Sequence, residues 1–254
     1  FCPSQLKPVK QAEKPSLTSP CLLLSTTESE PAANGRPCLN AWERPQPSTT
    51  AAADRRHQQW VAAGVFERLW ELGLLQLNLE GRLDWEFQSI DSASTKAPLG
   101  GQATGPNPTD RGKSGTKRHL LTETNGLPIS VLVTGANTHD KTQAQALLEA
   151  MPFLPPVEEP LHFCADKGYD YADVRSTIGV LGYEDHIKSR GQETIARLDQ
   201  PGYRARRWVC ERTHSWLNRY RGLLIRWEKK LANYKALLFL ACAHIVWKRS
   251  IIFG

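Results

Sequence analysis

Alternating apolar and polar residues run along positions 83–89 of this 254-residue chain. A two-residue period of this kind predicts a half-buried β-strand. We expect that strand to end at Asp91, within the segment SIDSAS. An aspartate at a strand end most often caps a turn, because its side chain bonds to nearby backbone groups. A turn cap and a chemical role both remain open from this segment alone.

The region before the strand divides into two parts. Residues 1–50 are rich in Pro, Ser and Thr and lack a sustained period, so we expect an irregular or disordered segment. Apolar residues at three- and four-residue intervals then predict one packed helix over residues 51–77, which the segment NLEG ends. Residues 51–80 therefore form a helical lead-in to a domain at 81–254.

The pattern after the strand predicts an α/β fold. A Gly- and Pro-rich loop at 96–115 precedes two further strands, and Asn125-Gly126 between them favours an antiparallel hairpin. Helix, strand, helix and strand follow, with the strands expected at 161–165 and 183–187, and two closing helices span roughly 203–221 and 231–249. This order is typical of a mixed sheet with helices on its faces.

Composition limits the possible classes of protein. The six cysteines show neither metal-ligand spacing nor a disulfide framework, which suits a reducing cytosol. The longest apolar stretch, at 236–247, is shorter than a membrane crossing needs. From residue 201 onward there are twelve Lys or Arg against two acids. Such a basic end favours a polyanion partner, although a solvated helix face has the same composition.

Two more carboxylates are candidates for chemistry. Asp166 directly follows the predicted strand at 161–165, and the ends of neighbouring parallel strands converge on one crevice, so we expect it beside Asp91. Glu211 lies in a strongly basic helix, where an ion pair with Arg207 one turn earlier is the structural alternative. Three carboxylates in one pocket suit Mg²⁺, and two such ions can promote phosphoryl transfer. Surrounding Lys and Arg would hold a phosphate backbone.

These segments carry a resemblance to a known family. The stretch from SIDSASTKAPLGG to GANTHD, together with CADKGYD and RRWVCERTHSWLNRYRGLLIRWEKK, resembles the catalytic core of bacterial insertion-sequence DDE transposases of the group usually numbered four and five. The resemblance covers roughly residues 61–248. It implies a ribonuclease-H-like fold in a DDE catalytic domain, with the acidic triad carried by Asp91, Asp166 and Glu211 as catalytic residues and metal ligands.

The family also implies cofactors, partners and a location. We expect Mg²⁺, with Mn²⁺ as an alternative, and double-stranded DNA as partner, both at the transposon ends and at the target. We further expect a homodimer when active, no membrane association, and a place in the bacterial cytoplasm with the nucleoid. The reaction would be cleavage and strand transfer at the ends of the insertion sequence.

The beginning of the chain departs from the family. Residues 1 to about 55 do not resemble its N-terminal helical region, and the chain begins with Phe1, which suggests a truncated or frame-shifted start. The alternative function is therefore a catalytically inactive relic of a transposase that only binds DNA.

Further residues are candidates for weaker roles. Trp208, Trp216 and Trp227 could stack on bases or pack in the core. The histidines and aspartate at family positions near the site are either supporting groups or structural partners: His119, His139 and Asp140. The basic residues assigned to DNA, against the alternative of a solvated face, are Lys113, Lys117, Arg207, Arg212, Arg219, Arg226, Lys229 and Lys230.

Overall fold

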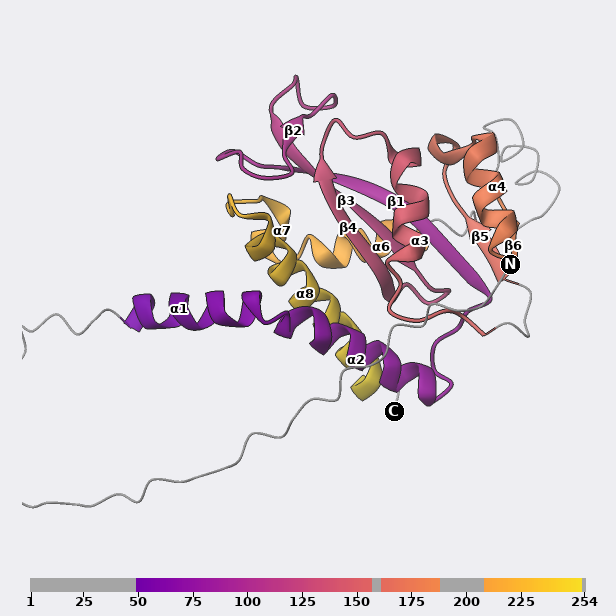
Figure 1. Cartoon of the computed structure of the whole chain (residues 1–254), viewed down its shortest axis with the longest axis horizontal. Helices are drawn as coiled ribbons and strands as arrows, with labels where there is room; N and C mark the ends of the chain where they lie inside the picture. Colours follow the sequence, from indigo (N-terminus) through magenta and orange to yellow (C-terminus); the bar gives the residue numbers. More distant parts are fainter. Residues whose placement is uncertain (1–48, 157–160, 188–207, 253–254) are drawn as a thin grey trace, which may run out of the picture. The chain divides into compact units, whose positions relative to one another are not determined.

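The computed structural model describes residues 49–156, 161–187 and 208–252 (Figure 1). All of them belong to one compact unit, residues 47–254. The expectation of an irregular segment at 1–50 lies almost entirely outside the described residues, and so does the role assigned to Arg207. No helix within the described ranges combines the length and apolar character that a membrane crossing requires.

The centre of the unit is a six-stranded mixed sheet. β1 (Phe87–Lys96) lies at its middle, antiparallel to β3 (Ser114–Thr122) and parallel to β5 (Leu161–Cys164). β6 (Tyr183–Asp185) continues the sheet parallel to β5, while β2 (Gly105–Pro106) and β4 (Pro128–Gly135) both pair antiparallel with β3. Antiparallel strands followed by parallel crossover strands form the ribonuclease-H-like sheet that the resemblance implied.

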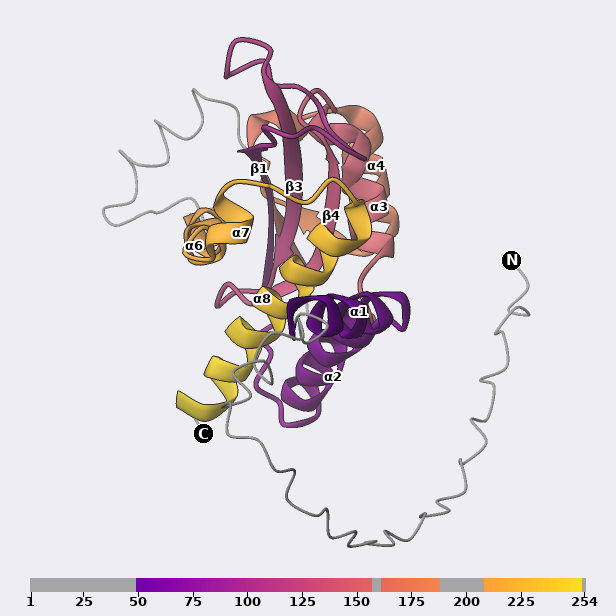
Figure 2. The same cartoon turned by 90° about the vertical axis from the view of Figure 1, so that its left-hand side faces the viewer.

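Helices cover both faces of this sheet. One face carries α3 (Ala144–Glu149), which follows the 3₁₀ turn η1 (Asp140–Gln143), and α4 (Ala172–Val180). The other face carries α6 (Trp208–Leu217) and α7 (Arg221–Leu224), and Figure 2 shows the two pairs on opposite sides. The predicted mixed α/β fold with helices on its faces is therefore confirmed.

The lead-in is two helices, so the prediction of one continuous helix is wrong. α1 (Thr49–Ala62) and α2 (Val65–Leu79) are separated at Gly64, whose φ of 66° lies in the left-handed region that interrupts a right-handed helix. α2 packs against the closing helix α8 (Leu231–Ile252), with the rings of Trp70 and Phe239 stacked 5.4 Å apart.

The predicted boundaries of the first strand are also wrong. Residues 83–86 alternate because Leu83 and Trp85 are buried, but regular pairing begins only at Phe87. β1 then runs past Asp91 to Lys96, because this second half pairs antiparallel with the first half of β3. Asp91 therefore lies within a strand, and the interpretation of this residue as a turn cap is wrong.

The hairpin of β3 and β4 is antiparallel, as predicted, but its turn is longer than two residues. Thr122 pairs with Pro128, which leaves residues 123–127 in the connection. The buried carboxylate of Glu123 closes this turn by accepting the backbone N–H of Leu127 at 2.9 Å. Gly126 supplies the positive φ of 86° that the turn requires.

The predicted helix near 203–221 is shorter in the described residues. α6 ends at Leu217, and the separate short helix α7 begins at Arg221. Leu224, the last residue of α7, is 51% exposed.

Candidate active site

The register of two parallel strands brings Asp91 and Asp166 level with each other. Phe87 pairs with His162 and Ser89 with Cys164, an offset of 75 positions that also separates Asp91 from Asp166. β5 ends at Cys164, and Asp166 follows as the N-cap of the 3₁₀ turn η2 (Lys167–Tyr169). Its carboxylate accepts the backbone N–H of Lys167 at 2.7 Å.

α6 brings Glu211 to the same region. Cys210, which is fully buried, donates its thiol hydrogen to the backbone oxygen of Ser89 at 2.8 Å. Burial raises the pKa of the Cys210 thiol, so it remains a protonated donor. This contact fixes the first turn of α6 over β1, two residues before Asp91. Glu211 follows Cys210 and is exposed, as an accessible ligand needs to be.

Three other carboxylates contribute to the electrostatics of Asp91. Burial is the main cause that raises the pKa of Asp91 from 3.8 to about 6, and a hydrogen bond from the Ser92 backbone N–H at 2.8 Å offsets part of it. The negative charges of Glu211, Asp166 and Asp140 raise the pKa further. Asp91 is thus a partly buried acid among three other acids, an arrangement that a cation would stabilise.

Asp140, at the start of η1, is held as an anion. Ser92 Oγ donates to its Oδ1 at 2.7 Å, and Lys117 Nζ donates to the same oxygen at 2.9 Å. Burial alone would raise the pKa of Asp140, but these two hydrogen bonds outweigh it and the pKa is lowered. Lys117 also donates to the backbone oxygen of Thr138 at 2.8 Å. Its side chain is 13% exposed and paired with Asp140, and its assignment as a DNA-binding residue stays a prediction.

The two histidines near the site have structural contacts. His119 is fully buried, its Nε2 lies 2.8 Å from Thr134 Oγ1, and burial lowers its pKa to about 4, so it is neutral at pH 7. His139 caps η1 by accepting the backbone N–H of Lys141 at 3.3 Å. These contacts agree with the alternative that both histidines are structural partners.

The basic residues assigned to DNA fall into distinct environments. Arg226 is fully buried and donates to the backbone oxygens of Gln102 at 2.7 Å and Glu228 at 2.9 Å. Its assignment as a phosphate contact is wrong, because the guanidinium instead fastens the 96–115 loop to the chain after α7. Four of the others are exposed: Lys113, Arg219, Lys229 and Lys230.

Arg212 lies beside a pocket between α6 and α8. Its guanidinium is 4.5 Å from the ring centre of Trp208 and 4.9 Å from that of Trp216, and it donates to the Asn125 backbone oxygen at 2.6 Å. The pocket has a volume of about 550 Å³ and is lined by aromatic and basic side chains, including Tyr220 and Lys248. Trp216 therefore packs against Arg212 at the pocket wall and, partly buried, also against the hydrophobic core, which agrees with the alternative of core packing.

Sequence reasoning missed the network that fixes Asp140. Ser92 on β1 is paired with His119 on β3, and Lys117 lies two residues before His119 on the same strand, opposite Ser94. The alternation of polar residues after Asp91 was a possible signal of these contacts. It can be interpreted only once the antiparallel register of β1 and β3 is known.

A mixed sheet with helices on both faces, whose central strand carries Asp91, defines the class of protein: a ribonuclease-H-like domain. The family model described as "Transposase DDE domain" matches residues 85–246, and the chain belongs to this family.

Two curated relatives agree with this. The putative transposase for insertion sequence element IS402 from Burkholderia cepacia is 40% identical over 149 residues, which are 57% of this chain and 68% of that protein. The putative transposase for element IS6501 from Brucella ovis is 28% identical over 141 residues, 53% of this chain and 98% of that protein.

Among solved structures, the catalytic domain of Mos1 mariner transposase is similar at 13% identity, with 74% of this chain and 92% of that chain covered and a TM-score of 0.31. A score this low supports no statement about the activity of the present chain.

Proposed function

We propose that this chain catalyses metal-dependent cleavage of DNA at the ends of an insertion sequence and transfer of the freed strand to target DNA. Asp91, Asp166 and Glu211 would be the catalytic carboxylates. The observation that carries this proposal is the position of Asp91 in the central strand and of Asp166 just beyond the parallel neighbour β5, and the raised pKa of Asp91, about 6, in the company of Glu211, Asp166 and Asp140 supports it. Stability alone does not favour gathering acids around a partly buried aspartate.

The donor set fits a hard divalent cation. Carboxylate oxygens are the ligands that Mg²⁺ and Mn²⁺ prefer, and Asp91 lies in β1 while Asp166 follows the end of the neighbouring parallel strand β5. Asp140 already accepts two hydrogen bonds, so it would tune the charge of the site more than hold an ion. When bound, a pair of such ions would activate the attacking water or hydroxyl and stabilise the leaving oxygen.

The protein's own groups then have separable tasks. Asp91, which would give up its proton near pH 6, would bind the cation only as a carboxylate. In cleavage, water oxygen bonds to phosphorus while the bond to the 3′ oxygen breaks, which leaves a 3′-hydroxyl. In transfer, the oxygen of that hydroxyl bonds to a phosphorus of the target and loses its proton, while the bond from that phosphorus to the target's 3′ oxygen breaks and the leaving 3′ oxygen takes up a proton. Exposed Lys229, Lys230 and Arg219 would bind the phosphate backbone during both steps.

A strand-cleavage assay with a matched variant tests the proposal. Asp166→Asn removes one charge from the carboxylate group with little change in shape, and Asp166 is exposed, so the fold should persist. We expect cleavage of end-containing duplex in Mg²⁺ to fall by at least about a hundredfold while DNA binding is unchanged. Asp54→Asn, at an exposed aspartate on α1, is the control.

The alternative function gives a different result. If the wild-type chain binds DNA but shows no cleavage in Mg²⁺ or Mn²⁺, the chain is a binding relic and the proposed catalysis is wrong. A homodimer in the active complex remains a prediction from the family.

A further inference from the structure

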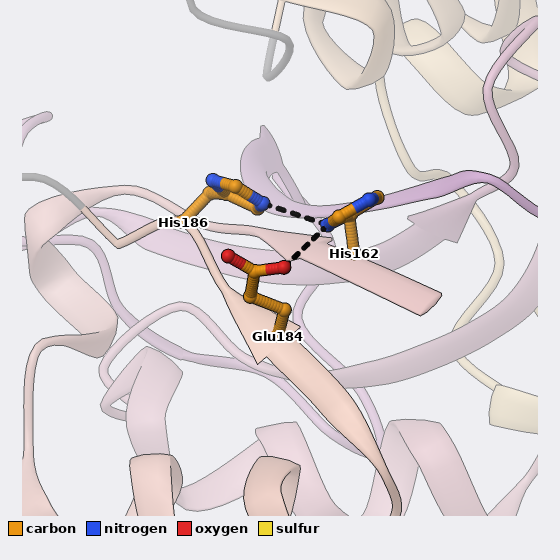
Figure 3. Close-up of side chains that lie close together, drawn as sticks. All are labelled: His162, Glu184 and His186. Atoms are coloured by element: carbon orange, nitrogen blue, oxygen red, sulfur yellow. Dashed lines mark hydrogen bonds and ion pairs between the residues drawn. The ribbon is translucent and has the colours of Figure 1, made fainter. Parts of the chain in front are cut away.

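A second cluster of metal-ligand side chains lies on β5 and on and just after its neighbour, the edge strand β6. His162 is on β5, Glu184 is its direct partner on β6, and His186 follows two residues later (Figure 3). One ligand atom from each residue lies within 4.8 Å of the other two. In the figure the three side chains converge from these neighbouring segments, and the dashed lines from His186 and Glu184 meet at one ring nitrogen of His162.

Two of the three ligand distances in this cluster are close to those of a tetrahedral zinc site. His162 Nδ1 lies 2.9 Å from His186 Nε2 and 3.4 Å from Glu184 Oε2. Ligand atoms about 2.0–2.1 Å from a tetrahedral Zn²⁺ are separated by about 3.3 Å. Opening the histidine pair by roughly half an ångström would admit the ion.

Neighbouring groups fix the orientation of the ligands. The ring of Phe87 stacks on His162 with centroids 4.7 Å apart and contacts His186 at 5.8 Å. The backbone N–H of His186 donates to the Phe163 oxygen at 2.7 Å, which holds this residue beside β5. Rings held by aromatic packing and backbone pairing lose little freedom when they bind an ion, which favours affinity.

The hydrogen-bonding pattern also favours an ion over a purely structural pair. His162 Nδ1 faces both the nitrogen of His186 and the carboxylate of Glu184. One ring nitrogen carries at most one hydrogen, so it cannot donate to both groups at once. A cation at the convergence point would accept electron pairs from all three.

We infer that His162, Glu184 and His186 form a binding site for a borderline transition-metal ion, of which Zn²⁺ is the natural example, separate from the carboxylate site. Two imidazoles and a carboxylate are a zinc donor set, whereas Mg²⁺ prefers oxygen ligands alone. Phe87, whose ring packs on this cluster, precedes Asp91 by four residues, so the two sites are separated by roughly 13 Å along β1. The ion would fasten the three-residue edge strand β6 to β5.

Binding of Co²⁺ to the full chain, followed by visible absorption and competition with Zn²⁺, tests the inference. Excess Mg²⁺ is present throughout, so that the carboxylate site is occupied by an ion without visible absorption. We expect a tetrahedral Co²⁺ spectrum that Zn²⁺ abolishes. Glu184→Gln should weaken binding by at least about tenfold, the lower end of losses caused even by outer-shell changes. The Glu184 side chain is 67% exposed, so this variant should fold.

Matched variants separate this site from the rest of the chain. His162→Gln should give the same loss as Glu184→Gln. Glu149→Gln, at an exposed carboxylate on α3, and His57→Gln, on α1, should bind Co²⁺ like the wild type. Asp166→Asn should also leave the spectrum intact, whatever its effect on DNA cleavage.

Two results would overturn the inference. One is Co²⁺ or Zn²⁺ binding that is equal in the wild type and in Glu184→Gln. The other is a spectrum that disappears in Asp166→Asn, which would assign the ion to the carboxylate site.

Discussion

Replacing Asp91 by asparagine should stabilise the protein in the absence of divalent cations. The pKa of Asp91 is raised from 3.8 to about 6, so its negative charge is less favourable in the folded chain than in the unfolded chain. The difference corresponds to at most about 3 kcal/mol at neutral pH. Because the side chain is partly exposed and screened by solvent, a gain of about 1–3 kcal/mol is expected.

The pH dependence of this gain follows from the direction of the shift. As pH rises from about 4 to about 6, the unfolded chain loses the Asp91 proton first, so the wild-type protein loses stability over this range. Above that range the loss of stability caused by the charge of Asp91 is constant. Below it Asp91 is protonated in both the folded and the unfolded chain, so there is no loss. Asp91→Asn should therefore be more stable than the wild type at pH 8 and equally stable at about pH 4.

Thermal unfolding followed by circular dichroism, with a chelator present, measures the effect. A gain of 2 kcal/mol would raise the melting temperature by about 4–8 °C. Asp54→Asn on α1 is the matched control and should change stability by less than about 0.5 kcal/mol. The reasoning is refuted if Asp91→Asn is no more stable than the wild type at pH 8, or if its gain persists unchanged at pH 4.

Three further predictions concern the same machinery. Mg²⁺ should raise the melting temperature of the wild type more at pH 8 than at pH 5, because Asp91 with a pKa of about 6 must lose its proton to bind the ion. Asp166→Asn should lack this increase, and equal increases in both proteins would contradict the prediction. Arg226→Ala should lower the free energy of unfolding in urea by about 2–4 kcal/mol, because carbonyl groups lose their hydrogen-bond donor, whereas Lys229→Ala should leave it unchanged. Equal free energies of unfolding in the two variants would contradict the buried structural role of Arg226. Lys229→Ala and Lys230→Ala should each lower the slope of log binding constant against log salt by about 0.9, and an unchanged slope would exclude a phosphate contact.

The sequence predicted the order of elements well, because alternation and helical spacing report burial directly. The antiparallel hairpin, the later strands and the closing helix all appear within a few residues of their predicted positions. The boundaries of β1 failed for a physical reason: residues 92–96 are mostly polar yet remain in the strand, since β3 pairs with them. Local pattern cannot show a partner strand that lies more than twenty residues away.

The candidate site was predicted in part. Asp91 and Asp166 came from their places at the expected strand ends, and the parallel register does put them level, although β1 itself continues beyond Asp91. Arg226 was misassigned, and the ion pair of Lys117 was not foreseen, because composition treats every basic residue as solvated. Their true partners are backbone oxygens and Asp140, which only the folded chain brings near.

The cluster of His162, Glu184 and His186 gave no signal in the sequence. Glu184 and His186 have the two-residue spacing of one strand face, but His162 is more than twenty positions earlier. The parallel pairing of β5 with β6 is what brings the three together. Spacing rules that find local metal motifs cannot detect a site of this kind.

The most direct test of the catalytic proposal is the location of Mn²⁺ by anomalous X-ray diffraction from crystals of the protein bound to DNA. The account predicts an anomalous peak within coordination distance of both Asp91 and Asp166, with Glu211 beside it or at a second peak. Mn²⁺ that binds without contacting either aspartate would contradict the assignment of the active site.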